Sequence, residues 1–156
     1  MQTQQTNAPA LSVVHSLIEM SIDGEKGFRD AAELAKDTSL KSLFEECARN
    51  CSSAVTELNG CAQALGDTHH EHTGSVAGTA HRSWQKIKAA FENSNMAVLE
   101  EIERGEDHAK AAYTKALQSD ALPLATRTIV QKQYEGVLKN HDRIRDLRDT
   151  YRANAS

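Results

Sequence analysis

Apolar residues recur every three or four positions along most of the chain, which is the spacing of one face of an α-helix. The clearest run is Leu40, Phe44, Cys47, Cys51, Ala54, Leu58, Cys61 and Leu65. Steps that alternate between four and three are typical of a helix that packs along its whole length in a bundle. Asp37 and Thr38 are suitable N-cap residues before this run, and Gly66 is a suitable stop after it. We therefore predict a long helix between these signals.

Three further helical regions show the same periodicity. The first spans residues 11–36, and its inward positions are Val14, Ile18, Ser21, Glu25, Phe28, Ala32 and Ala35. The third begins near Ser75 and is predicted to be broken into two parts by residues 92–95; the second part presents Leu99, Ile102, Glu106, Ala109, Tyr113 and Ala116 on one face. The fourth starts near Pro123, with Val130, Val137, Ile144, Leu147 and Tyr151 inward. Short connections within the first and last pairs of helices predict an all-α, antiparallel four-helix bundle.

The length and composition fit this architecture and limit the partners. The chain has 156 residues, enough for one domain, and only two prolines. Residues 1–10 are polar and are predicted to be a disordered leader, which leaves residues 11–152 for the bundle. A net charge of −4 argues against nucleic acid as a partner, and the absence of a long apolar run argues against a membrane. Three cysteines without an export signal predict a reduced, cytoplasmic protein.

Four short strings carry a resemblance to a known family. They are Asp23-Gly24-Glu25-Lys26-Gly27-Phe28 with Ala31-Ala32-Glu33, His81-Arg82-Ser83-Trp84 followed by Lys88, Glu103-Arg104-Gly105-Glu106-Asp107, and His141-Asp142-Arg143-Ile144-Arg145. Together they resemble a bacterial family of ferritin-like four-helix-bundle proteins whose domain is catalogued as of unknown function. The resemblance covers residues 11–148. It implies a ferritin-like bundle with a link to iron or another metal.

The standard ferritin-like metal ligands are not all present. That site takes one Glu from each of two helices and a Glu-x-x-His pair from each of the other two. No Glu-x-x-His pair occurs on the predicted second or fourth helix: Glu46 is followed three residues later by Arg49, and Glu135 by Leu138. Any metal site in this chain must therefore use a different set of side chains.

A second set of polar residues falls inside the predicted bundle. At 1.5 Å per residue, counting from Asp37 and Asp120 places Glu25, Cys51, Glu106 and Glu135 in one layer, with His141 about two turns further along. Carboxylates inside a bundle are costly unless they are paired or bound to metal. We therefore predict an interior transition-metal site, with iron favoured over copper; the candidate ligands are Glu25, Glu103, Glu106 and His141, followed by Glu135, Cys47 and Cys51.

Such a protein would serve metal or oxidative-stress handling, either by chemistry with O₂ or peroxide or by sequestration without turnover. The alternative is a metal-free bundle that acts through protein–protein contacts, including contacts within a homodimer. In that case Glu25 turns outward, and Glu106 pairs with His141 or with an arginine such as Arg104. Whether the protein is an enzyme stays open.

Two groups of soft or nitrogen ligands offer other metal chemistry. Cys47 and Cys51 are four residues apart on one helix face and could bind Cu(I), which favours thiolates. Buried cysteines also pack as small apolar residues. His69, His70 and His72 carry good ligands for Zn²⁺, Ni²⁺ or Cu²⁺ but lie in a polar loop. We predict that any metal binding by these loop histidines is adventitious.

Overall fold

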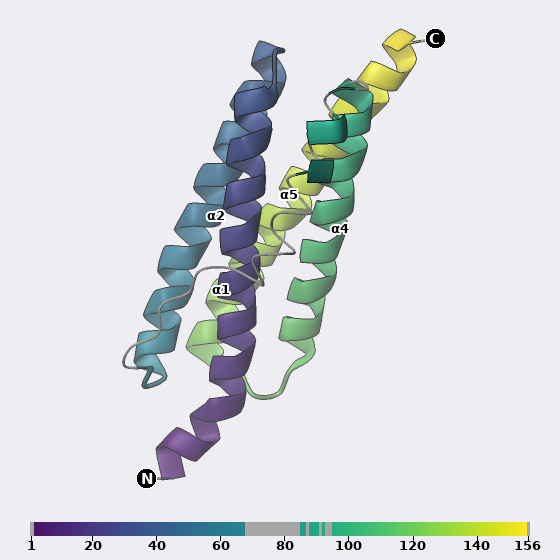
Figure 1. Cartoon of the computed structure of the whole chain (residues 1–156). Helices are drawn as coiled ribbons and strands as arrows, with labels where there is room; N and C mark the ends of the chain where they lie inside the picture. The colour runs from purple at the N-terminus through teal and green to yellow at the C-terminus, as the bar shows by residue number, and fades with distance from the viewer. Residues whose placement is uncertain (1, 68–84, 87, 91, 93–94, 156) are drawn as a thin grey trace.

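Four long helices form the structure, a computed structural model that describes residues 2–67, 85–86, 88–90, 92 and 95–155 (Figure 1). The helices are α1 (Gln2–Leu34), α2 (Thr38–Ala64), α4 (Asn95–Gln118) and α5 (Leu124–Ala155). The described residues contain no strand, so the all-α prediction is confirmed. The first part of the predicted broken third region falls largely outside the described residues. Among the helices that are described, none has the length and apolarity needed to span a membrane.

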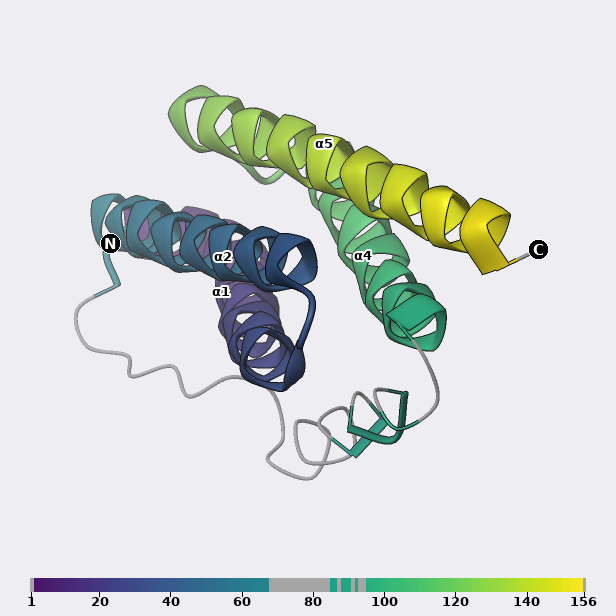
Figure 2. The same cartoon turned by 90° about the horizontal axis from the view of Figure 1, so that it is seen from above.

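The helices are arranged as two antiparallel hairpins. Figure 1 shows α1 and α2 running in opposite directions, as do α4 and α5. The hairpins lie beside each other, so that α1 contacts α4 and α2 contacts α5 (Figure 2). The short links within each hairpin follow from the turn signals that the sequence carries. The long connection between α2 and α4 carries most of the residues that the structure does not describe.

Both ends of α2 are set by the residues that the sequence singles out. The Asp37 carboxylate accepts hydrogen bonds from the backbone N–H groups of Ser39, at 2.8 Å, and Leu40, at 3.4 Å. These bonds satisfy donors that the first helical turn leaves without a partner. At the other end Gly66 has a φ of +98°, which L side chains rarely adopt, so a glycine suits this position. The predicted N-cap and stop are confirmed.

The apolar seams are buried in two separate clusters. One cluster gathers around Phe28, Phe44 and Ile144, at the end of the bundle that holds the turn between α1 and α2. The other gathers around Ile18, Leu58 and Val130, near the turn between α4 and α5. Seam positions between the clusters, such as Cys51, Ala54 and Val137, are only half-buried. The core is therefore interrupted in the middle of the bundle.

The start of α1 is tied to the end of α2. The helix begins at Gln2 and contains Pro9, so it includes the segment predicted as a leader. Asn7 donates a hydrogen bond from Nδ2 to the backbone oxygen of Leu65 at 3.0 Å, and Ala10 is fully buried. These contacts hold the first helix against the stop of the second.

Polar side chains link α2 to α5 along the length of the bundle. Arg143 donates to Glu46 at 2.9 Å, and the Tyr151 hydroxyl donates to the Asp37 carboxylate. Gln133 donates from Nε2 to Glu57 at 3.1 Å. These contacts fix the relative positions of the two hairpins where apolar packing between them is sparse.

Two glycines inside helices give opposite predictions when changed to alanine. An added Cβ at Gly60 meets nothing within 4 Å, whereas one at Gly24 lies 3.1 Å from the Cys51 Sγ atom. Alanine lowers the conformational entropy lost on folding, so Gly60→Ala should raise the free energy of unfolding by about 0.5–1 kcal/mol. Gly24→Ala should gain less or be destabilising, because Cys51 must shift. Denaturant unfolding of the two variants tests this, and an equal gain in both would contradict the close approach of α1 to α2.

Candidate functional site

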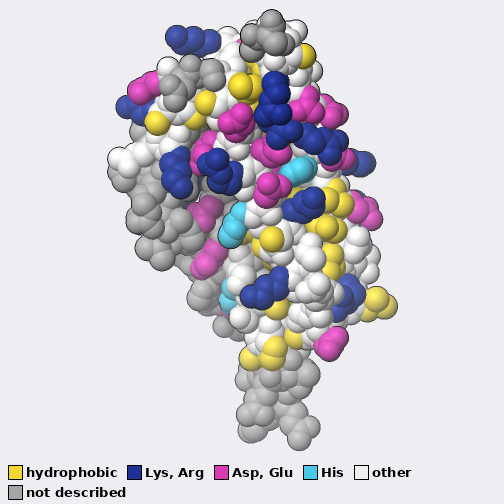
Figure 3. All heavy atoms as spheres, turned by 90° about the vertical axis from the view of Figure 1, so that its right-hand side faces the viewer, with side chains coloured by type: hydrophobic (Ala, Val, Ile, Leu, Met, Phe, Trp, Pro, Cys, Tyr) yellow, Lys and Arg dark blue, Asp and Glu magenta, His cyan; other side chains and the backbone are white. Residues whose placement is uncertain are grey.

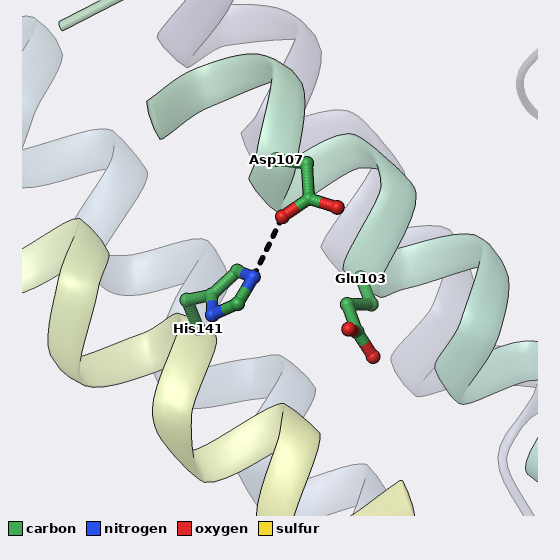
Figure 4. A group of neighbouring side chains, drawn as sticks. All are labelled: Glu103, Asp107 and His141. Atoms are coloured by element: carbon green, nitrogen blue, oxygen red, sulfur yellow. Dashed lines mark hydrogen bonds and ion pairs between the residues drawn. The ribbon is translucent and has the colours of Figure 1, made fainter. Parts of the chain in front are cut away.

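The strongest cluster of metal-type ligands in the described part of the chain lies between α4 and α5. Glu103, Asp107 and His141 each offer one ligand atom, and these atoms all lie within 4.8 Å of one another. His141 Nε2 lies 2.6 Å from Asp107 Oδ1. Figure 4 shows the Asp107 carboxylate facing the His141 ring, with Glu103 one turn away on the same helix. Two carboxylates and one imidazole are a ligand set that suits a divalent transition metal.

Helix geometry and the antiparallel register bring these residues together. Glu103 and Asp107 are four positions apart on α4, which places both on one face. The register on α5 is marked by a second pair, since Thr114 donates to the Tyr134 hydroxyl at 3.3 Å. Thr114 follows Asp107 by seven residues, and Tyr134 precedes His141 by seven. Two heptad-spaced contacts of this kind hold His141 opposite Asp107.

Arginine side chains accompany this cluster. Arg148 on α5 donates to Glu103, and both side chains are partly buried. Arg148 also has a second carboxylate, Asp149, 3.0 Å from its Nη2 atom. On the face formed by α4 and α5, Figure 3 shows acidic and basic side chains interspersed, with histidine among them. Arg148 would therefore keep Asp149 as a carboxylate partner if the Glu103 carboxylate turned away from it to bind a metal ion.

The structure separates the other predicted ligands from this cluster. Glu25 on α1 pairs with Arg29 at 2.7 Å, and Glu135 on α5 is exposed. Cys47 is fully buried in the apolar cluster around Phe44. Cys51 lines a cavity in the middle of the bundle. Of the predicted ligands, only Glu103 and His141 meet, and the loop residues His69, His70 and His72 lie outside the described residues.

Glu106 is buried in the middle of the bundle and takes no part in this cluster. Its residue is 6% exposed, and it makes no hydrogen bond or ion pair with the described residues. Burial raises the pKa of Glu106 to about 7, and the neighbouring charge of Asp107 adds to this shift. The predicted pairing of Glu106 with His141 or Arg104 is not found, since His141 faces Asp107 and Arg104 donates to Glu101.

The sequence prediction missed Asp107, although a signal for it was present. Asp107 follows Glu103 at the i,i+4 spacing that places two side chains on one helix face. Its neighbour Glu106 occupies an apolar seam position and is the more conspicuous carboxylate. Reading α4 for pairs on its flank, rather than for polar residues in its seam, would have found the group.

The core cysteines are in surroundings that disfavour thiolates. Burial raises the pKa of the Cys47 thiol to about 12, and the charge of Glu106 raises it further. The same two causes, in the same order, raise the pKa of Cys51 to about 12. Because Cu(I) binds the thiolate form, these surroundings lend no support to copper binding by this pair.

The comparison with known families settles the affiliation of the chain. Residues 10–119 match the family described as Domain of unknown function (DUF2383). The chain belongs to this family. The match covers α1 from residue 10 onward, α2 and α4, and therefore Glu103 and Asp107, and it ends before α5 and His141. No curated protein matches the chain. The predicted resemblance to a family of unknown function is confirmed.

The raised pKa of Glu106 predicts how the stability of this DUF2383 protein depends on pH. The folded-state pKa of about 7 lies above the ordinary value of 4.5, so the folded protein holds the extra proton between these values. Stability from this group is therefore greatest below about pH 4.5 and falls as the pH rises to 7. Glu106→Gln stays neutral, and we expect it to exceed wild type above pH 7 by on the order of 2–3 kcal/mol.

Denaturant unfolding between pH 5 and pH 8, with chelator present, measures this difference. The gain from Glu106→Gln should shrink towards pH 5, where wild-type Glu106 is itself protonated. Glu100→Gln is the matched control, because Glu100 is an exposed carboxylate on the same helix. A Glu106→Gln variant less stable than wild type at pH 8 would contradict the buried, unpaired carboxylate.

The thiol surroundings give a second prediction for native protein. At pH 8 iodoacetamide should label Cys47 and Cys51 far more slowly than in denaturant, because burial removes both access and the thiolate form. Cys51 should react before Cys47, since only Cys51 lines the cavity. Peptide mass spectrometry after timed labelling separates the two residues. Equally fast labelling of Cys47 and Cys51 in native protein would contradict their burial in the structure.

Proposed function

We propose that this protein binds one divalent transition-metal ion, iron in the cell, between α4 and α5. The observation that carries the proposal is the convergence of Glu103, Asp107 and His141 from two helices, with their ligand atoms within 4.8 Å of one another. Carboxylate oxygens with an imidazole nitrogen suit iron(II), manganese(II) and zinc(II) better than Cu(I). Three protein ligands leave positions for water or a small substrate. Metal sequestration or oxidative-stress handling is the cellular role we infer.

The arrangement of the helices supports the choice of iron. We infer a ferritin-like bundle, because two antiparallel hairpins joined by one long connection have the connectivity of that fold (Figure 1). Ferritin-like bundles hold metal through Glu and His side chains on facing helices. In this chain the proposed ligands face each other across α4 and α5, on the flank of the bundle, and the central carboxylate Glu106 stands apart from them.

The side chains already present can accommodate an ion. His141 would give up the proton that it shares with Asp107, because only an unprotonated ring nitrogen can bind metal. Glu103 would leave Arg148, which retains Asp149 at 3.0 Å. Neither change requires the helices to move apart.

A metal-free bundle that acts through contacts with other proteins is the second candidate. The observation in its favour is that all three side chains of the cluster have protein partners: His141 pairs with Asp107, and Glu103 pairs with Arg148. In that case the two ion pairs fix the register of α4 against α5, and the cluster has a structural role without metal. The two candidates give opposite results in one titration.

Anaerobic titration of tag-free, chelator-treated protein with Fe(II) tests the metal proposal. We expect one ion per chain, with affinity at least about tenfold weaker in Asp107→Asn and in His141→Gln, since each change removes a ligand. Glu100→Gln is the control, because Glu100 lies on the same helix and pairs with Arg152 at 3.8 Å outside the cluster. Replacing His69, His70 and His72 together with serine should leave this affinity unchanged.

Two outcomes would defeat the proposal. Wild-type protein that binds no ion during the titration would favour the metal-free bundle. Binding that survives in Asp107→Asn and His141→Gln but disappears in the variant without the three loop histidines would place the metal in the loop.

A further inference from the structure

A cavity of about 840 Å³ lies in the middle of the bundle, between the two apolar clusters. Side chains from all four long helices line it, among them Ser21, Cys51, Glu106 and Gln133. Its volume is within the range of pockets that hold small organic molecules, roughly 300–1,000 Å³. The cavity is distinct from the cluster of Glu103, Asp107 and His141, since none of these three residues lines it.

Small residues keep this space open. Gly105 on α4 and Gly136 on α5 line the cavity, and an added Cβ at either position meets nothing within 4 Å. Ala54 on α2 and Ala109 on α4 line it as well. Glycine inside a helix is destabilising relative to alanine. Packing does not require glycine at these two positions, because an alanine side chain would fit at each. The interruption of the core therefore coincides with positions where larger side chains would fit.

Among the described residues that line the cavity, Glu106 is the only charged side chain that is buried. Three lysine and arginine residues line it too, but all are exposed and lie at its rim: Lys86, Arg104 and Lys132. The groups whose charges act on or respond to Glu106 are Asp107 and Tyr113 on its own helix and Cys47 and Cys51 on α2. None of these is a cation. A buried carboxylate without a counter-charge is destabilising, which makes the cavity receptive to a positive group.

We propose that the cavity binds a small organic cation, an amine with an apolar body, whose ammonium group pairs with the Glu106 carboxylate. Phe28, Ile102 and Val137 line the space that an apolar body would occupy. The buried hydroxyl-bearing residues Ser21 on α1 and Tyr113 on α4 also line the cavity and provide oxygen acceptors. An ammonium donates up to three hydrogen bonds and accepts none, which matches a lining whose buried charge is negative.

A metal ion is a poorer occupant of this cavity. The described residues hold one group of three metal-type ligands, and Glu106 does not belong to it. Cys51 also lines the cavity, but its pKa is raised to about 12, and the protonated thiol is a poor metal ligand. A single carboxylate suits one ammonium group, whereas a transition metal needs further anionic or imidazole ligands. This inference is independent of the metal site between α4 and α5.

The test uses full-length, chelator-treated protein at pH 8 and three probes with the same six-carbon chain. Hexylammonium chloride should bind and raise the melting temperature, and hexan-1-ol should bind about tenfold more weakly or worse, since it lacks the charge. Hexanoate should not bind measurably. Isothermal titration calorimetry gives the affinities, and a thermal melt gives the shift.

Two variants locate the binding. Glu106→Gln keeps the shape and removes the charge, so it should abolish the preference for the ammonium over the alcohol. Glu101→Gln is the matched control, because Glu101 is a cavity-lining carboxylate on the same helix that pairs with Arg104, and it should keep the preference. Ala54→Phe should weaken both the ammonium and the alcohol, since the larger side chain fills the space.

Several results would overturn the proposal. Hexylammonium that fails to bind, or that binds wild type and Glu106→Gln equally, removes the role of the carboxylate. Equal binding of ammonium and alcohol by wild type would leave an apolar cavity without charge selectivity. Stronger binding of hexanoate would show that the rim cations dominate. Asp107→Asn should weaken Fe(II) binding and spare hexylammonium, so failure of one proposal is distinguishable from failure of the other.

Discussion

The Glu106 carboxylate is buried between four helices, and no cation of the described residues lies beside it; this is the constraint around which the rest of the bundle is arranged. A charge in that position opposes folding, so the apolar clusters on either side must supply the free energy that holds it. The cluster around Phe28 and Phe44 does this at one end, and the cluster around Ile18 and Leu58 does so at the other. The same constraint explains the raised pKa of Glu106 and of the two nearby thiols, because each reflects a charge that the interior does not stabilise.

The two helices of each hairpin are held together by different kinds of contact. Between α1 and α2 the contact is apolar: the rings of Phe28 and Phe44 lie 6.3 Å apart between centroids, and Ala31, Ala32 and Ala48 lie in the same buried cluster. Between α4 and α5 polar side chains meet: Tyr113 donates to Gln133 at 2.9 Å, and Asp107 faces His141 at 2.6 Å. Polar contacts demand a particular register, whereas apolar surfaces tolerate small shifts. The candidate metal ligands lie on this second hairpin, where such contacts fix their relative positions.

The helices, the α2 cap and stop and most seam positions could be predicted from the sequence, because each depends on local periodicity or turn chemistry. Leu40, Phe44 and Leu58 are buried as the four-and-three spacing requires. The site could not be predicted in the same way, because it depends on the offset between helices. Counting from Asp120 placed His141 two turns from the carboxylates, yet His141 lies opposite Asp107. The offset is set by the connection between α4 and α5, where Arg127 donates to the backbone oxygen of Leu117 at 2.5 Å, and no periodicity encodes that geometry.

Adjacent positions on α4 place two carboxylates in different surroundings. Successive residues of a helix are turned by about 100°, so Glu106 faces the cavity while Asp107 faces α5. Asp107 is exposed and keeps its contact with water, whereas Glu106 has lost it. Burial is the larger cause of the raised pKa of Glu106, and the charge of Asp107 is the smaller one. Glu106 and Asp107 are therefore coupled only by a modest electrostatic interaction, and they share no hydrogen bond. The proposed metal ion on the flank and the proposed organic cation at the centre would therefore be separate functions, because Asp107 faces His141 on α5 whereas Glu106 lines the cavity.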